Sequence, residues 1–397
     1  MYTRKHVNTS PVYLYTCIPV YLCTCVLVYV FTFLSNYETT EPPNYMTDYI
    51  GFGMLTPVTI MTVERFPRHN TGAMVKEIKE FVFDDAAIIA CCLAQWGVDA
   101  GMIGTSLGND PRGHRLALEL KSRGVRCDVR FTNDYETPIE VDVSDRRGAR
   151  TYFWQRTPEM LATLDSADLS MIEGARLMYV DWYDGESHIT RAMKEANRLE
   201  VPVFLNLEHG HKDVHLLKRY AKHTTICQAV TDAAQLGQNR ALMGTARKLL
   251  NAGIEIAVVT MAKEGCLVAR GDEAIRIFAP KVRAVDACGA GATFSSGFAY
   301  GYLQGWDMER SARFATAAAS LKVTRAGLDM FPLAEIEALA AKLKVEHLAF
   351  RDNQFVKIGK AIAFQQKNLE RKTRHLAHRI AASPLIPKKK PQEKRKP

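Results

Sequence analysis

Residues 285–305 read VDACGAGATFSSGFAYGYLQG, and this stretch decides the fold. It follows a predicted strand at residues 275–278 and a short extended segment, and it opens a helix predicted over residues 293–304. Small residues around Gly289 and Gly291 let the backbone approach an anion closely, while the helix N-terminus adds free N–H groups and the positive end of its dipole. The stretch therefore predicts a site for a phosphate-sized anion.

Elsewhere in the middle of the chain, short β-rich runs alternate with amphipathic helical runs. Strands are predicted at or near residues 49–54, 101–104, 177–180, 201–205, 225–229, 256–260 and 266–270. Helices are predicted at residues 86–95, 110–122, 189–199 and 242–252. This alternation predicts an α/β fold with a mostly parallel sheet covered on both faces. Three more strand-like runs, at residues 127–130, 139–143 and 150–154, predict an antiparallel patch that forms a small lid.

The charge of the chain is concentrated at one end. The sequence has 52 Lys and Arg against 43 Asp and Glu, a net charge of +9. Residues 351–397 hold 14 of the basic and 3 of the acidic residues. The remaining chain has 38 basic and 40 acidic residues and is therefore close to neutral. A nucleic-acid-binding domain carries its charge on a folded face. We therefore favour a solubilising tail over one that contacts nucleic acid or an acidic membrane surface.

The two ends predict separate segments around one main domain. Residues 11–36 carry no charge and are long and apolar enough for a membrane anchor. The segment repeats itself, however, and an ordinary domain sequence starts at Met46, so a start site there is favoured over an anchor. The nine cysteines lack paired zinc-type spacing, which is typical of reduced, buried thiols in a cytoplasmic protein. We predict an N-terminal extension at 1–45, the main domain at 46–345, and a basic helical and disordered tail at 346–397.

Together with its neighbours, the glycine-rich stretch resembles the C-terminal signature of the ribokinase-like, PfkB-type carbohydrate kinases. Residues 93–125 resemble the family's segment around Gly-Asp-Asp-x-x-Gly, and residues 258–269 (VVTMAKEGCLVA) resemble its nucleotide-side strand and turn. VERFP at residues 63–67 resembles the start of its lid region. The resemblance implies a ribokinase-like fold with a central, mostly parallel sheet and a small β-lid. It also implies transfer of the ATP γ-phosphate, with Mg²⁺, to a hydroxyl of a sugar or related compound.

The resemblance assigns roles to the glycine-rich turn. Gly289, Ala290 and Gly291 take the positions of the family's anion hole, and these positions are intact. The base position, which in the family is an Asp that deprotonates the acceptor hydroxyl, is Ala292. Because Ala292 cannot accept a proton, we consider Asp286, at the start of the motif, as a substitute carboxylate.

Other polar positions of the family are also replaced. Its early sugar-binding Asp falls at about Val58, and its magnesium-linked Asn-x-x-Glu falls on residues 228–231, with Asp232 next to it. The Gly-Gly-x-x-x-Asn motif falls on residues 83–88, where Asp84 and Asp85 replace a tight sugar-binding turn. These two acids either cap the helix that follows, which we favour, or contact the substrate.

Further site residues come from the nucleotide turn and the lid. The nucleotide turn keeps Thr260 and Gly265 but has Ala262 where the family has glycine. Arg150 and Tyr152 match a lid strand that in the family often faces the substrate, and an outward orientation is equally open. The histidines at 209, 211 and 215 form a polar surface turn rather than a metal site, and no metal ligands are assigned. Trp96, Trp154, Trp182 and Trp306 are expected to be packing residues.

Three hypotheses follow. The first is a sugar or nucleoside kinase, with a relocated base or with impaired activity. The second is a non-catalytic relative that binds a nucleotide or metabolite and acts as a sensor or partner. The third is a tail-driven binder that keeps the kinase fold as a scaffold. The resemblance also suggests a homodimer formed through the lid.

Overall fold

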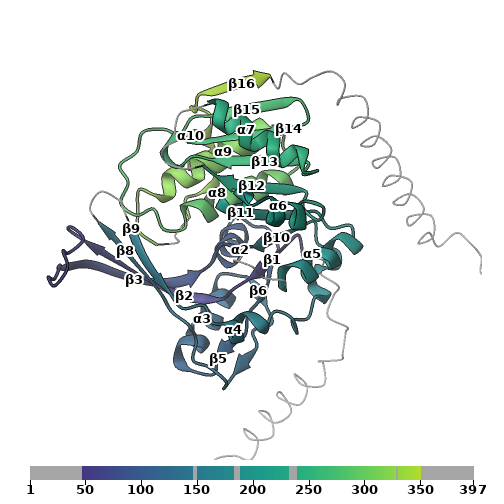
Figure 1. Ribbon diagram of the computed structural model, residues 1–397. Helices are drawn as coiled ribbons and strands as arrows, with labels where there is room; N and C mark the ends of the chain where they lie inside the picture. The colour runs from purple at the N-terminus through teal and green to yellow at the C-terminus, as the bar shows by residue number, and fades with distance from the viewer. Residues whose placement is uncertain (1–46, 146–149, 183–187, 232–238, 328–329, 350–397) are drawn as a thin grey trace, which may run out of the picture. The chain divides into compact units, whose positions relative to one another are not determined.

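The computed structural model describes residues 47–145, 150–182, 188–231, 239–327 and 330–349 (Figure 1). The apolar segment at 11–36, the basic tail beyond residue 350 and Asp232 lie outside these residues, so the predictions made for them stay predictions. None of the described helices is long and apolar enough to cross a membrane.

A ten-stranded sheet forms the centre, in the order β16-β15-β14-β13-β12-β11-β10-β1-β4-β6. Its strands are β1 (Tyr49–Gly53), β4 (Ala100–Gly104), β6 (Arg126–Cys127), β10 (Leu177–Asp181), β11 (Val203–Glu208), β12 (Ile226–Val230), β13 (Ile256–Thr260), β14 (Cys266–Arg270), β15 (Glu273–Ile277) and β16 (Val345–Ala349). Pairing from β6 to β13 is parallel, and the last three strands pair antiparallel. The predicted mostly parallel sheet is confirmed, and it extends to Ala349, beyond the predicted boundary at 345.

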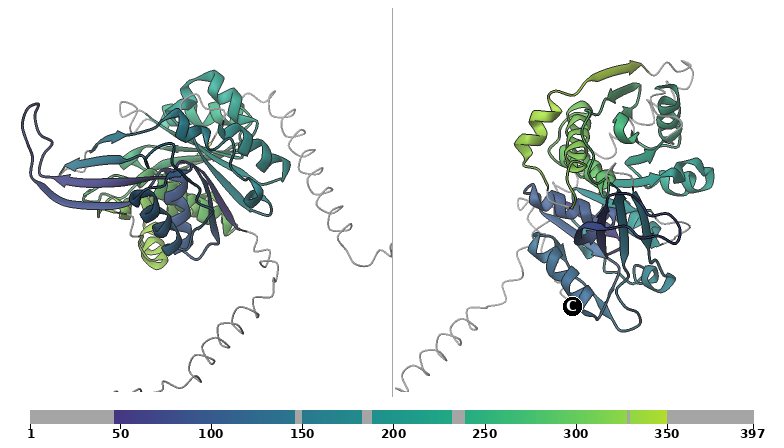
Figure 2. Two further views of the ribbon diagram at one scale, coloured as in Figure 1. Left: turned by 90° about the horizontal axis from the view of Figure 1, so that it is seen from below. Right: turned by 90° about the vertical axis from the view of Figure 1, so that its left-hand side faces the viewer.

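Helices cover both faces of the sheet, as Figure 2 shows from below. One face carries α2 (Asp85–Gln95), α3 (Pro111–Ser122), α8 (Ala290–Leu303), α9 (Met308–Lys322) and α10 (Leu333–Ala340). The other carries α4 (Pro158–Ala162), α5 (His188–Arg198), α6 (Val214–Ala221) and α7 (Asn239–Asn251). Because both faces are covered, the inner strands are apolar throughout; every residue of β1, β4 and β10 is buried.

The lid is a separate four-stranded sheet in the order β3-β2-β8-β9. Its strands are β2 (Thr56–Val63), β3 (Val75–Phe83), β8 (Glu140–Asp145) and β9 (Arg150–Trp154). The predicted antiparallel pairing of residues 139–143 with 150–154 is confirmed as β8 and β9. The third predicted member, 127–130, was wrong: only Arg126 and Cys127 form a strand, and it pairs parallel with β4 at the edge of the central sheet. Two residues of β5 (Leu107–Gly108) pair with β7 (Phe131–Thr132) beside it.

The glycine-rich stretch forms a turn and then helix α8. The helix begins at Ala290, three residues before the predicted start, because Gly289 adopts a left-handed conformation (φ 70°) as its N-cap. The later glycines of the stretch serve packing. A Cβ at Gly297 would lie 2.6 Å from the Cα of Ala315 in α9, so only glycine allows these two helices to approach so closely.

Candidate functional site

The candidate site lies where the carboxyl ends of β1, β10 and β11 meet the start of α2, the turn before α8 and the inner face of the lid. This edge of a parallel sheet is where α/β proteins bind ligands, since strand-to-helix turns present backbone N–H groups there.

The turn before α8 keeps the features of an anion cradle. Gly289 N-caps the helix without a side chain, and no described residue accepts a hydrogen bond from the N–H groups of Gly291 or Ala292. A Cβ placed on Gly291 would meet no atom within 4 Å, so this exposed residue is not crowded on its side-chain side. N–H groups without an acceptor at the start of a 14-residue helix suit a phosphate.

The residue at the base position contributes only a methyl group. Ala292 lies in the first turn of α8 and is fully buried. Its side chain holds no atom that accepts a proton, so the turn can hold an anion but supplies no base at this position.

Asp286, considered above as a substitute base, has its carboxylate engaged by three partners. Its carboxylate is fully buried and accepts hydrogen bonds from the Lys322 ammonium (2.8 Å), the Ser144 hydroxyl (3.0 Å) and the Cys288 amide (3.0 Å). Both carboxylate oxygens are engaged, and the partners come from the lid, the turn and α9. Asp286 therefore ties these three elements together, and its role as a substitute base stays a prediction.

The start of α2 carries two acids with different surroundings. Asp85 accepts hydrogen bonds from the Tyr179 hydroxyl (3.1 Å) and the Asn206 amide (3.0 Å), which project from β10 and β11. Asp84 precedes the helix but makes no side-chain capping bond. The Ala86 amide at the helix start is instead bound by Asp181 of β10, at 3.0 and 3.2 Å. The favoured expectation that Asp84 and Asp85 cap this helix was thus wrong, because Asp181 does so.

Asp84 also adopts a backbone conformation that normally requires glycine, with φ 71° and ψ 148°. Ala262, in the turn after β13, has a positive φ of 45° as well. Both positions match glycines of the family's motifs. The backbone has kept the glycine conformation at these positions although the side chain has changed, at a cost of about 1–3 kcal/mol for each such residue.

The lid contributes acids and arginines to its inner face. Glu140, Asp142 and Ser144 alternate along β8 and are all buried. Opposite them, Arg150 forms an ion pair with Asp142 (3.1 Å), and Arg156, just past β9, lies 3.6 Å from Asp84. The lid therefore reaches the start of α2 through charged side chains, which places Arg150 on the site side rather than outward.

Two aromatic rings lie between these arginines. The Tyr152 and Trp154 rings stack with their centroids 5.2 Å apart. The Arg150 guanidinium lies 5.0 Å from the centroid of the Tyr152 ring, and the Arg156 guanidinium lies 5.5 Å from that of the Trp154 ring. The rings are about half exposed, at 46% and 51%. Trp154 is therefore not the packing residue that was expected, whereas Trp96 packs edge-on against Phe314.

The acids of the site are held in an environment that disfavours their charge. Burial, the largest cause, raises the pKa of Asp84 to about 6, with the Arg156 charge acting in the opposite direction. Burial, then the charges of Asp84 and Asp142, raise the pKa of Glu140 to about 8. The pKa of Asp181 is likewise raised, by burial and then by Asp84 and Asp85. Among the described residues, the acids of the site therefore outnumber its cations.

The nucleotide-side residues lie at the ends of β12 and β13. Thr260 ends β13, and its carbonyl accepts from the Thr231 amide at 3.2 Å. Ala262 begins the 3₁₀ helix η4 (Ala262–Glu264). Gly265 has φ 91°, and a Cβ there would lie 2.2 Å from the Ile277 carbonyl oxygen, so this turn requires glycine. Gln228, at the family's magnesium-linked Asn position, is buried and accepts from the Ser295 hydroxyl at 2.9 Å.

The histidine-rich segment after β11 forms a 3₁₀ helix, η2 (His209–Lys212). His211 is buried there, with its Nδ1 2.6 Å from the Glu208 carbonyl oxygen. Across the described residues, no group of three or more His, Cys, Asp or Glu side chains is arranged to hold a metal ion.

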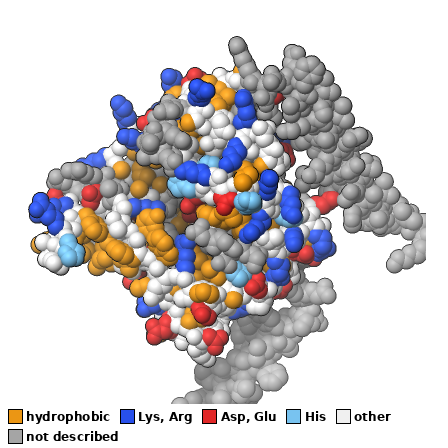
Figure 3. All heavy atoms as spheres, in the orientation of Figure 1, with side chains coloured by type: hydrophobic (Ala, Val, Ile, Leu, Met, Phe, Trp, Pro, Cys, Tyr) orange, Lys and Arg blue, Asp and Glu red, His pale blue; other side chains and the backbone are white. Residues whose placement is uncertain are grey.

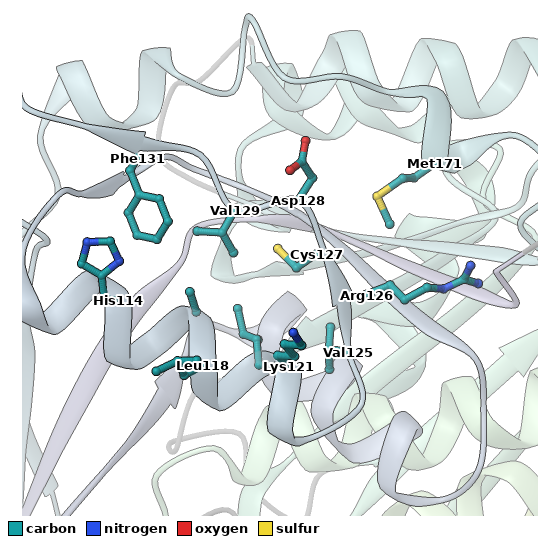
Figure 4. Close-up of a pocket in the computed structure, with 12 residues that line it drawn as sticks. His114, Leu118, Lys121, Val125, Arg126, Cys127, Asp128, Val129, Phe131 and Met171 are labelled. Carbon is teal, nitrogen blue, oxygen red and sulfur yellow. The ribbon is translucent and has the colours of Figure 1, made fainter. Parts of the chain in front are cut away.

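A separate open pocket of about 820 Å³ lies between α3 and the segment leading from β6 to β7 (Figure 4). His114 and Leu118 of α3 line it from one side and Cys127 and Phe131 from the other, with Met171 nearby. The His114 and Phe131 rings are 4.4 Å apart. Nothing in the structure shows what covers this pocket, and it is not part of the site described above.

Several site residues were missed from the sequence. Asp181 and Asn206 directly follow predicted strands at 177–180 and 201–205, so their place at the carboxyl ends of neighbouring parallel strands was a usable signal. Glu140 lies on β8, where polar and apolar residues alternate. The polar face of this strand is the buried one, so the sequence pattern did not single Glu140 out as a site residue. Lys322 ends a helix far along the chain, and no pattern connects it to Asp286.

Known proteins resemble this chain in sequence. The model of the pfkB family carbohydrate kinases matches residues 69–334. A sugar kinase from Archaeoglobus fulgidus, itself uncharacterized, is 24% identical over 242 residues, which is 59% of this chain and 95% of that protein. The ribokinase of Bacillus subtilis is 24% identical over 270 residues, covering 68% of this chain and 90% of the ribokinase.

Solved structures show the same fold. The phosphofructokinase-2 of Escherichia coli, in complex with substrates and products, superimposes with a TM-score of 0.63 at 15% identity, over 74% of this chain and 98% of that one. The ribokinase of Arabidopsis thaliana, in complex with ribose and ATP, superimposes with a TM-score of 0.59 at 20% identity. The match covers 74% of this chain and 98% of the ribokinase. At these identities the likeness concerns the fold, including the central sheet and the lid.

Proposed function

Because the chain belongs to the PfkB family of carbohydrate kinases, we propose that it binds ATP and a sugar-like polyol at this site and transfers phosphate slowly. The acceptor hydroxyl would form the new O–P bond as the bond from the γ-phosphorus to the β,γ-bridging oxygen breaks and ADP leaves. The hydroxyl proton would pass to water, since Ala292 cannot take it. General-base assistance contributes about 10²–10⁴ to a rate, and we expect a loss in this range.

One observation carries this proposal: an open anion cradle lies directly beside a buried alanine. The N–H groups of Gly291 and Ala292 have no hydrogen-bond acceptor among the described residues, and Gly291 is exposed, so a phosphate can approach the start of α8 there. The engaged carboxylate of Asp286 removes the nearest alternative base on the same turn. The arrangement therefore favours retained nucleotide binding with reduced chemistry.

The remaining roles follow from position. The γ-phosphate would lie against Gly289, Ala290 and Gly291, and the rest of the nucleotide would extend toward Thr260 and the Ala262–Gly265 turn. The polyol would lie between Asp84, Asp85 and the lid arginine Arg150. Mg²⁺ would arrive with the ATP phosphates, since the described side chains form no metal site of their own.

We also propose that two copies associate through the outer face of the lid. Met61 of β2 pairs with Ile78 on one side and Val143 on the other, and Val141 pairs with Phe153. Ile78 and Phe153 are 58% and 57% exposed, so this outward band is apolar and open. Figure 3 shows hydrophobic side chains gathered over the lid at the left of the view. Sedimentation of an Ile78→Lys variant should give a monomer where the native chain gives a dimer.

Nucleotide binding and turnover are tested together on the full chain. Thermal unfolding with and without ATP or ADP measures binding, because a ligand that binds only the folded state raises the melting temperature. ATP consumption across a panel of sugars and nucleosides measures chemistry. We expect stabilisation by both nucleotides and slow turnover. No stabilisation by either nucleotide would refute the proposal, and rapid turnover would refute its statement about the base.

A further inference from the structure

The described part of the polyol site has more acidic than basic side chains. The pKa shifts above arise from groups that act on one another across the start of α2, the lid and the end of β11. Its acids are Asp84, Asp85, Asp142, Asp181, Glu140 and Glu208, and its described cations are Arg150 and Arg156. Both arginines are already paired, with Asp142 and Asp84 respectively. A neutral sugar would leave this excess of negative charge in place.

Glu140 is the clearest sign of an absent partner. It is only 4% exposed, and its carboxyl group has no hydrogen bond or ion pair with a described residue, although its oxygens, unlike Asp84 Oδ2, still touch solvent. It projects from the inner face of β8, and the nearest charges acting on it include Asp84 and Asp142. A buried polar group is normally satisfied, so one that points into a ligand site indicates what the ligand must bring. Here it must bring a hydrogen-bond donor, preferably a charged one.

Asp84, at the start of α2, also has an incompletely satisfied carboxyl group. Its Oδ2 is buried without a hydrogen bond of acceptable geometry among the described residues, although the Thr56 hydroxyl lies beside it. Its carboxylate is also held on a strained backbone, at a position where the family's motif has glycine. Glu140 from the lid and Asp84 from the start of α2 are therefore two incompletely satisfied carboxyl groups, close enough for the charge of Asp84 to act on Glu140.

We propose that the ligand of this site is a polyol that carries a protonated amine, an amino sugar or an aminocyclitol, with the ammonium bound by Glu140 and Asp84. An ammonium offers three donors in a compact shape and matches both the charge and the unsatisfied acceptors. The other acids, Asp85 and Asp181, already accept bonds from Tyr179, Asn206 and the Ala86 amide, which leaves them to orient hydroxyl groups. This inference rests on the proposed function, since it names the substrate class of the same site.

A bound cation should also make Glu140 lose its proton. The charged groups facing Glu140 are Asp84 at the start of α2, Asp142 on its own strand, and the arginines Arg150 and Arg156 on and after β9. An ammonium placed next to Glu140 favours its ionised form, so binding of an amine releases a proton and binding of a neutral sugar does not.

The test is titration calorimetry of the full chain without ATP, at about pH 6.5, where the amines used are protonated. The probes are D-glucosamine, 6-amino-6-deoxy-D-glucose and 2-deoxystreptamine, with D-glucose and N-acetyl-D-glucosamine as neutral counterparts. We expect at least one amine to bind about tenfold to a hundredfold more tightly than the neutral compounds. Repeating the titration in buffers of different ionisation enthalpy should reveal proton release for that amine alone.

Variants assign the effect to the proposed residue. Glu140→Gln keeps the shape of the side chain and should remove both the preference for the amine and the proton release. Glu80→Gln changes an exposed acid on β3 of the same lid and should leave both unchanged. If all amines bind no more tightly than neutral sugars, or if Glu140→Gln keeps the preference, the inference is overturned. Because no ATP is present, a failure of phosphoryl transfer would not affect this result.

Discussion

The Lys322 ammonium lies 2.8 Å from the Asp286 carboxylate, and both side chains are almost completely buried, at 1% and 0% exposure. The same carboxylate binds the Ser144 hydroxyl on the lid and the Cys288 amide in the turn before α8. The amides of Val285 and Asp286 in turn bind the Val323 carbonyl oxygen, at 2.7 and 3.2 Å. The C-terminal end of α9, the anion cradle and the lid thus meet at one buried ion pair.

Removing the ammonium should destabilise the fold strongly. Lys322→Met leaves the Asp286 charge buried without its partner, and breaking a buried pair in this way typically costs about 3–5 kcal/mol. Urea unfolding measures this loss. The double variant Lys322→Met, Asp286→Asn removes both charges and should recover most of it. If the double variant is less stable than Lys322→Met alone, the pair is not the source of the effect.

Filling the space before the cradle should block nucleotide binding without harming the fold. In Gly291→Leu the new side chain enters a volume that no other atom approaches within 4 Å. Replacing a helical glycine generally adds up to about 1 kcal/mol of stability. We expect an unchanged or higher melting temperature and a loss of stabilisation by ATP. Gly244→Leu in α7, where the space is also open, is the control and should keep the ATP effect.

Restoring glycine at residue 84 should stabilise the protein. Asp84 holds φ 71°, and relief of that conformation together with loss of a buried carboxyl group should gain about 1–3 kcal/mol. Denaturant unfolding of Asp84→Gly checks the gain. A decrease in stability would mean that the ion pair with Arg156 outweighs the backbone strain. The variant should also lose affinity for the polyol, which would explain why an acid stands at a strained position.

Stability should fall as the pH rises through the range where Glu140 ionises. Its pKa is raised from 4.5 to about 8, so between these values the folded protein holds more protons than the unfolded chain. The free energy of unfolding therefore decreases with rising pH in this window. Urea midpoints measured from about pH 5 to 8.5 should drop, and Glu140→Gln should flatten the decline. Equal slopes for both proteins would contradict the raised pKa.

The fold could be predicted because its determinants are local. The alternation of buried strands with capped helices is visible in the sequence; α3, for example, begins at Pro111 behind the Asp110 cap, whose carboxylate binds the amides of Arg112 and Gly113. The lid was predicted only in part. Its strands β2 and β3 pair with each other across a long turn, and the short β6 has the composition of a lid strand but pairs with β4.

The site could be predicted only where motifs mark it. The predicted anion cradle and the alanine predicted at the base position, Ala292, are both read from one contiguous stretch. The roles of Asp286 and Asp84 do not, because they depend on partners far apart in the chain, Lys322 in one case and Arg156 in the other. Helix capping was assigned to the nearest acids by proximity in sequence, whereas Asp181 reaches the Ala86 amide from a neighbouring strand.

The rate of ATP-dependent phosphoryl transfer in the native chain and in Ala292→Asp, measured with the same acceptor, tests the central claim most directly. An Asp in the first turn of α8 is compatible with the helix dipole and restores a proton acceptor beside the cradle. Ala292→Asn, similar in shape but not a base, is the control. We predict that Ala292→Asp is faster than both other proteins by about 10²–10⁴. A native rate equal to that of Ala292→Asp would show that the missing base does not limit this protein.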